Sequence, residues 1–128
     1  MKTRKIWANL GVEDLARTTK FYTDLGFKSN GASNELTSFI VGENDFVIHF
    51  FLKSILQPSM KGAIADLTTG NEVIFTLSAD SKEEVENWEK DVIHAGGTLV
   101  SESEEFGEGY YGFVFADPDG HKYNVFYM

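Results

Sequence analysis

The stretch DPDGHKYNVFYM, residues 117–128, is the most informative part of the chain, because it reads as a tight turn leading into a terminal strand. Pro118 presets the backbone for the second position of a turn, and Gly120 gives freedom where that turn ends. Beyond the turn, side chains alternate between two faces, and Asn124 and Phe126 share one of them. The stretch therefore predicts a final β-strand entered through a turn.

An earlier segment, residues 10–27, has the pattern of a strand end followed by a helix. Asp14 is a good helix N-cap, because its side chain can accept a hydrogen bond from a backbone N–H of the first turn. Gly26 favours the left-handed backbone conformation that ends many helices. Between them lies an inward-facing stripe at helical spacing, which consists of Leu15, Thr18, Phe21, Tyr22 and Leu25.

The chain contains a diverged internal repeat, in which each copy is a strand, a helix and a meander of three strands. In the second copy, Ser81 and Glu84 form a capping box that starts the helix, and Gly96 follows its end. The expected strands are 5–12, 27–30, 36–41 and 46–52 in the first copy, and 72–78, 98–101, 110–115 and 121–127 in the second. The turn Gly42–Asp45 joins the last two strands of the first copy.

The repeat predicts a single domain of residues 1–128. Module one covers about residues 1–53, a connecting segment about 54–70, and module two about 71–128. The connecting segment contains Pro58 and several small residues, so it could act as a linker, as a lid, or as both.

The two segments together make the chain resemble the vicinal oxygen chelate superfamily. That superfamily includes glyoxalase I, extradiol dioxygenases, fosfomycin resistance proteins and bleomycin resistance proteins, and the resemblance covers nearly the whole chain. It implies an α+β fold, in which two βαβββ modules form an open, U-shaped partial barrel with the helices on the outside. It also implies a small-molecule ligand on the concave face, and a homodimer.

Metal-dependent members of the resembled superfamily take their ligands from four positions on that face. The motifs place these positions at Trp7, His49, Glu72 and Asn124. Because Trp cannot coordinate a metal and Asn is a weak neutral donor, His49 and Glu72 are the weak candidates that remain. Two ligands are too few for a tightly held catalytic ion, so we expect no metal and no other cofactor, with a divalent ion as the alternative. The register of Glu72 against Ile74 stays open.

Strand alternation places a set of side chains towards the cleft and the opposite set against the helices. The expected cleft residues are Trp7, Asn9, Val47, His49, Phe51, Glu72, Asn124 and Phe126. The expected helix-facing residues are Ala8, Leu10, Ile48, Phe50, Val73, Phe75, Tyr123 and Val125. The cleft is thus largely aromatic and apolar with a few polar groups, which is the usual composition of a small-molecule site.

Three functions fit these residues, and no catalytic residue is assigned. Ligand binding or sequestration without a tightly held metal, as in bleomycin resistance proteins, explains the missing metal ligands most simply. The enzyme alternative is a lactoylglutathione-lyase-like or dioxygenase-like protein with an unusual site at His49 and Glu72, where a metal would polarise a carbonyl group. The third is a structural or interaction module.

Composition limits the other classes of partner. The net charge of −9 would repel phosphate backbones, so we expect no nucleic acid. No run approaches the roughly 18 apolar residues that a membrane helix needs, so we expect no membrane partner. The chain has no cysteine, which excludes disulfides and thiolate catalysis and suits a cytoplasmic protein.

Overall fold

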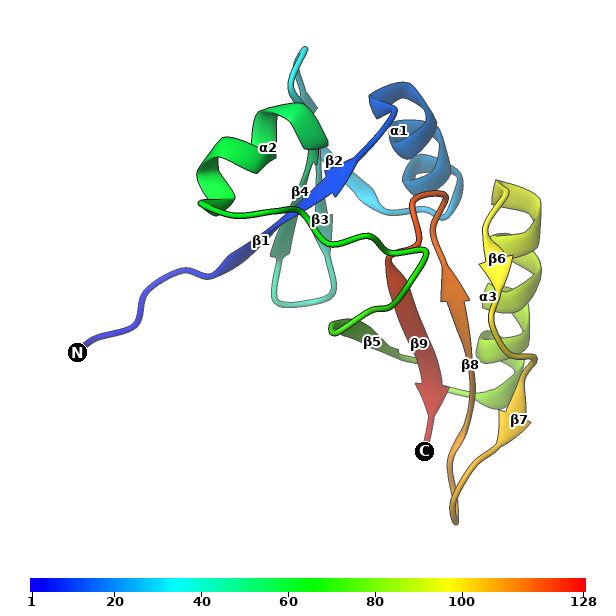
Figure 1. The fold of residues 1–128 in the computed structure, drawn as a ribbon. Helices are drawn as coiled ribbons and strands as arrows, with labels where there is room; N and C mark the ends of the chain where they lie inside the picture. Colours follow the sequence, from blue (N-terminus) through cyan, green and yellow to red (C-terminus); the bar gives the residue numbers. More distant parts are fainter. The chain divides into compact units, whose positions relative to one another are not determined.

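The computed structural model describes residues 1–128 (Figure 1). Its first unit, residues 1–64, follows the predicted order of a strand, a helix and three more strands. Its elements are β1 (Trp7–Val12), α1 (Leu15–Asp24), β2 (Lys28–Ala32), β3 (Leu36–Val41), β4 (Phe46–Leu52) and α2 (Lys53–Met60). The sheet order is β1-β4-β3-β2. Strand β1 runs parallel to β4, and the other pairs are antiparallel.

Helix α1 begins and ends where the sequence predicts. Asp14 is the N-cap and accepts a 3.0 Å hydrogen bond from the backbone N–H of Arg17. Gly26, just past the helix, has a φ of 90°, which residues with a Cβ atom rarely adopt. The buried face of α1 packs on β3 and β4, where Tyr22 stacks on Phe50 with ring centroids 4.5 Å apart. These aromatic contacts form the core of the first unit.

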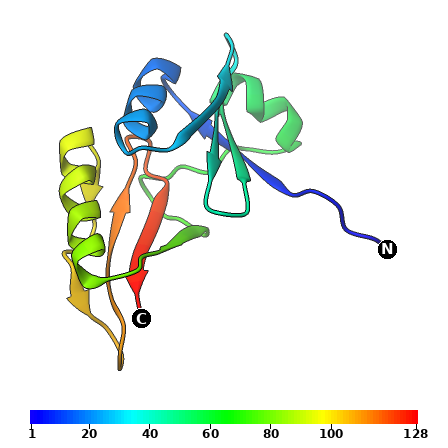
Figure 2. The same cartoon turned by 180° about the vertical axis from the view of Figure 1, so that it is seen from behind.

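Helix α2 was not expected, because residues 54–70 read as a connecting segment. It packs on β1 and β4, so it belongs to the first unit, which ends at Ile64. Gly11 makes room for it: a Cβ there would lie 3.0 Å from Lys53 Cγ and 3.6 Å from Leu56 Cδ2. Gly11 lies on the same face of β1 as Trp7 and Asn9, because alternate residues of a strand share a face. Helix α2 therefore covers one end of this face, which is opposite the face that α1 covers, as Figures 1 and 2 show.

The second unit, residues 65–128, repeats the order of the first with one strand divided in two. Its elements are β5 (Ile74–Ser78), α3 (Lys82–Ala95), β6 (Thr98–Leu99), β7 (Glu104–Glu105), β8 (Tyr111–Ala116) and β9 (Lys122–Tyr127). The sheet order is β5-β9-β8-β6, and the short β7 pairs with β8 as well. Part of the acidic stretch that follows β6 is therefore a strand. The α+β class with two βαβββ modules is confirmed.

The predicted caps and turn of the second unit are present. Ser81 Oγ accepts a 3.0 Å hydrogen bond from the backbone N–H of Glu84. The Glu84 carboxylate accepts a hydrogen bond from the backbone N–H of Asp80. In a standard capping box the donor would be the N–H of the N-cap residue, which here is Ser81, one residue later. In the final turn, the buried Asp117 carboxylate accepts from the backbone N–H groups of Asp119 and His121 at 3.0 and 2.9 Å. This carboxylate fixes the entry into β9.

The core of the second unit is aromatic, as in the first. Tyr123 is fully buried and stacks on Phe115, with ring centroids 5.0 Å apart. Val73 is not part of this core: it precedes β5 and is 59% exposed, whereas we expected it to face the helix. The expectation placed Val73 on the face of Phe75 by strand alternation, but β5 begins only at Ile74, so alternation does not apply to residue 73. No helix in the chain is long and apolar enough to span a bilayer.

Candidate functional site

One face of the first sheet is left uncovered by α1 and only partly covered by α2. The β1–β4 register sets Trp7 opposite Val47, Asn9 opposite His49, and Gly11 opposite Phe51. The β3–β4 register sets Ser38 opposite His49 as well. The five cleft residues that the sequence predicts in module one therefore share this face: Trp7, Asn9, Val47, His49 and Phe51.

A hollow of about 730 Å³ lies at the end of this face that α2 leaves open. It is formed by the segment that leads into β1, by Asn30 in the bulged part of β2, by the turn between β3 and β4, and by β4 itself. Its lining is Lys5, Ile6, Trp7, Asn30, Asn44, Asp45, Phe46, Val47 and His49. We refer to it below as the Trp7 hollow.

Trp7 supplies the largest aromatic surface of the Trp7 hollow. The residue is 53% exposed, although tryptophan is usually well buried. It stands edge-on to His49, with ring centroids 6.4 Å apart and an angle of 69° between the rings. Phe51 contacts His49 in a similar edge-on way at 6.0 Å. The imidazole is therefore held between two aromatic side chains.

Hydrogen bonds fix His49 from the side of the sheet. Its Nδ1 lies 2.8 Å from the Oγ of Ser38, and the Nδ2 of Asn30 donates to the same oxygen at 3.0 Å. Ser38 is buried at 2% exposure, so this hydroxyl is shielded from water. Asn30, Ser38 and His49 thus form a polar chain that ends at the Trp7 hollow.

Sequence reasoning missed Asn30 and Ser38 as site residues. Ser38 was within reach, because the turn Gly42–Asp45 lies midway between Ser38 and His49 in a hairpin, which makes them opposite partners. Asn30 could not be predicted in this way, because the β2–β3 register shifts between Ser29 and Ala32. Strand alternation does not predict which face a residue takes across such a bulge.

In the second unit, the corresponding face carries Asn124 and Phe126 of β9. Asn124 pairs with Thr76 of β5, and Lys122 lies two residues before it on the same face. Glu72 does not start the strand as we expected: β5 begins at Ile74, and Glu72 is an exposed residue that precedes it. Glu72 is therefore not placed by the sheet.

The register also shows which residues are equivalent in the two copies. Asn9 pairs with His49 and lies five residues before the N-cap Asp14; Thr76 pairs with Asn124 and lies five residues before the N-cap Ser81. His49 and Asn124 are therefore equivalent, as predicted. Counting back from the two N-caps in the same way, the residue of the second copy that is equivalent to Trp7 is Ile74 and not Glu72.

The family model of the Glyoxalase/Bleomycin resistance protein/Dioxygenase superfamily matches residues 6–125. The chain belongs to this superfamily. No curated protein sequence matches the chain. Among solved structures, it is similar to a hypothetical protein from S. aureus, with 30% identity and a TM-score of 0.87, covering 100% of this chain and 96% of that one.

Two further superfamily structures share the fold. A glyoxalase-related enzyme from Fulvimarina pelagi is 22% identical with a TM-score of 0.86, and the match covers 98% of this chain and 89% of that one. A fosfomycin resistance protein from Listeria monocytogenes is 17% identical with a TM-score of 0.73, and the match covers 100% and 93%. At these identities the likeness shows the fold.

Strong metal donors are scarce at the positions that the resemblance implies. With Ile74 in place of Glu72, the four positions hold Trp, His, Ile and Asn, and only the imidazole of His49 is a strong donor. Of the two ring nitrogens of His49, Nδ1 contacts Ser38, and the ammonium group of Lys122 shares a face with Asn124, where it would repel a cation. No group of three or more His, Asp or Glu side chains suited to a metal ion is present.

Proposed function

We propose that this superfamily member binds a small organic ligand in the Trp7 hollow, without a tightly held catalytic metal. The observation that carries the proposal is the half-exposed Trp7 ring beside a hydrogen-bonded His49 at the edge of the hollow. A volume of about 730 Å³ suits a small molecule, since such sites span roughly 300–1,000 Å³.

The lining suggests how a ligand would be held. A flat or apolar part of the ligand would lie against Trp7, where stacking contributes about 0.5–1.5 kcal/mol beyond the burial of surface area. Polar groups of the ligand would meet Asn30, Asn44 and His49, which can supply oriented hydrogen bonds. Ligand binding and sequestration need no reactive group, so they are consistent with the side chains that line the Trp7 hollow.

Tryptophan fluorescence tests the proposal directly, because the chain has only Trp7 and Trp88. In the Trp88→Phe variant, all tryptophan emission comes from Trp7. We expect saturable quenching or a spectral shift on titration with at least one member of a panel taken from the functions of the superfamily: bleomycin, fosfomycin, lactoylglutathione and catechol.

The matched control is Trp7→Phe, in which Trp88 on α3 is the reporter and should not respond to the same ligand. If the emission of Trp7 stays unchanged with every compound, or if Trp88 responds equally, the Trp7 hollow is not the binding site.

We further propose that the protein is a cytoplasmic homodimer. Large apolar side chains are exposed near the start of one edge strand in each sheet: Ile6 before β1, and Val73 and Ile74 at β5. Exposed apolar groups of this kind favour association. Light scattering at micromolar concentration should give twice the chain mass of 14.3 kDa. A mass equal to one chain at all concentrations would refute the dimer.

A further inference from the structure

The Ser38 hydroxyl lies between two nitrogen atoms, and its single hydrogen can serve only one of them. A hydroxyl group has one hydrogen to donate and two lone pairs that accept. Asn30 Nδ2 is a donor, so it occupies one lone pair of Ser38 Oγ at 3.0 Å. The hydrogen of Ser38 then needs an acceptor, because the side chain is buried from water.

His49 Nδ1, at 2.8 Å, is the acceptor that this hydrogen can reach. If Nδ1 carried the imidazole hydrogen instead, Ser38 Oγ would accept twice and its own hydrogen would be buried without a partner. That arrangement is unfavourable, since an unmet buried donor costs more than a hydrogen bond gains. The neutral imidazole therefore carries its hydrogen on Nε2.

The Nε2 atom of His49 has no hydrogen-bond partner in the protein and is not among the buried unpaired atoms, while His49 lines the Trp7 hollow. We propose that Ser38, as a positioning residue, holds His49 in the Nε2–H tautomer, so that His49 donates a hydrogen bond to the ligand. The ligand then carries an acceptor oxygen at His49 and an apolar part at Trp7, and the cationic side chains beside the Trp7 hollow make an organic acid the ligand class that we infer. The assignment of the ligand class rests on the function proposed above, whereas the tautomer does not.

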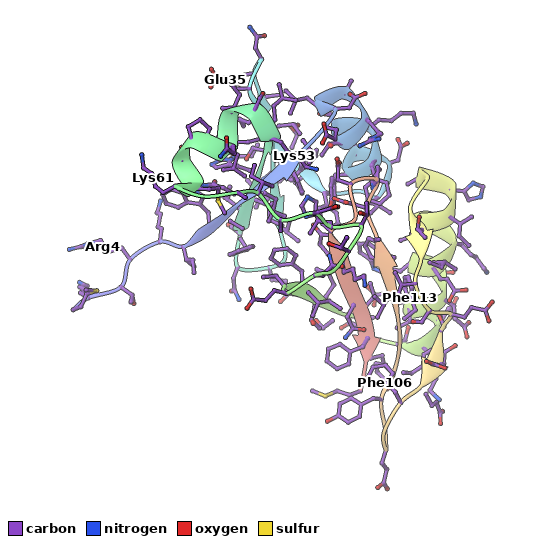
Figure 3. All side chains as sticks on the ribbon, in the orientation of Figure 1. Arg4, Glu35, Lys53, Lys61, Phe106 and Phe113 are labelled. Atoms are coloured by element: carbon purple, nitrogen blue, oxygen red, sulfur yellow. The ribbon has the colours of Figure 1, made fainter.

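Charge around the site agrees with an acid. Lys5 lines the Trp7 hollow and also a neighbouring hollow of about 540 Å³, together with Lys2, Thr3, Arg4 and Trp7. Arg4 extends from the segment that precedes β1 (Figure 3). The two hollows thus carry three cationic side chains against one carboxylate, Asp45, in a chain whose net charge is −9. This local surplus would attract an anion.

Nitrogen-15 NMR of the wild-type protein at neutral pH tests the tautomer without any ligand. We expect the His49 signals to show a protonated Nε2 and a non-protonated Nδ1, and the His49→Gln variant identifies these signals by their loss. The exposed His94 in the same spectrum is the internal comparison, because it should average between tautomers. A proton on Nδ1 of His49, or averaging like that of His94, overturns the proposal.

Variants of Ser38 separate positioning from simple structural support. Ser38→Ala should shift His49 towards a mixture of tautomers, and Ser38→Thr, which keeps the hydroxyl, should restore the Nε2–H form. If both variants keep the wild-type tautomer, Ser38 does not set it.

Three probes with one ring and different head groups test the ligand class: phenylacetate, phenylacetamide and 2-phenylethylamine. In the Trp88→Phe protein, phenylacetate should bind at least about tenfold more tightly than the amine, and Ser38→Ala should remove about that factor. If the amine binds as tightly as the acid, or if none of the three binds, the assignment to acids fails. The proposed function itself is judged separately, by the response of Trp7 and Trp88 to the superfamily panel.

Discussion

Replacing Phe50 by alanine should lower the free energy of unfolding by about 3–5 kcal/mol, the range for large aromatic side chains removed from a core. Phe50 is fully buried in β4, the strand that pairs with both β1 and β3. It stacks on Tyr22 of α1 at 4.5 Å and meets Phe39 edge-on at 6.3 Å. Alanine would leave a cavity that these rigid rings cannot close. Urea unfolding followed by circular dichroism measures the change.

Two further variants control for the size of the change. Phe106→Ala removes the same side chain from a position that is 41% exposed, so it should cost much less than Phe50→Ala. Phe50→Leu keeps most of the volume and should fall between the wild type and the alanine variant. Equal losses for Phe50→Ala and Phe106→Ala would contradict the core that the structure describes.

Gly112→Ala should cost at least about 2 kcal/mol, because β8 and β9 come too close there for any side chain. A Cβ at Gly112 would lie 2.3 Å from the carbonyl oxygen of Val125, and 2.8 and 2.9 Å from Cβ and Cα of Phe126. Two of these three atoms belong to the backbone of β9, so no change of rotamer can relieve the contact. The strand itself must move, and with it the pairing of Gly112 with Phe126. The midpoint of urea unfolding should fall accordingly.

The control for Gly112→Ala is Gly70→Ala in the same unit. A Cβ at Gly70 would meet nothing within 4 Å, and its backbone does not adopt the left-handed conformation. This change should be neutral or slightly stabilising, because alanine has fewer unfolded conformations to lose. If Gly112→Ala is as well tolerated as Gly70→Ala, the two strands are not as close as described.

These stability tests bear on the candidate site, because the sheets position it. In the first unit, β4 presents Phe50 to the core and His49 to the opposite face, so the same alternation that builds the core aims the imidazole at the Trp7 hollow. Asn124 occupies the equivalent place in the second unit without an equivalent of Ser38, since Val114 stands opposite it. The two copies have therefore kept one architecture while their side chains diverged.

Local sequence patterns determined much of the fold. The bounds of β3 and β4 agree with the prediction, because the turn Gly42–Asp45 and strict alternation are signals carried by the residues themselves. The caps Asp14 and Ser81 also act through their own next few residues. Alternation alone likewise placed Trp7 and His49 on one face and Ala8 and Phe50 on the other.

Tertiary structure decided the rest, because partners far apart in the chain leave no local signal. Helix α2 has no side-chain cap and contains Pro58, so its stability comes from Leu56 packing beside Gly11. The start of β5 at Ile74 is set by pairing with β9, 48 residues later, through backbone groups that every residue shares. The chain from Asn30 through Ser38 to His49 likewise exists only because a bulge and a hairpin bring three strands into register.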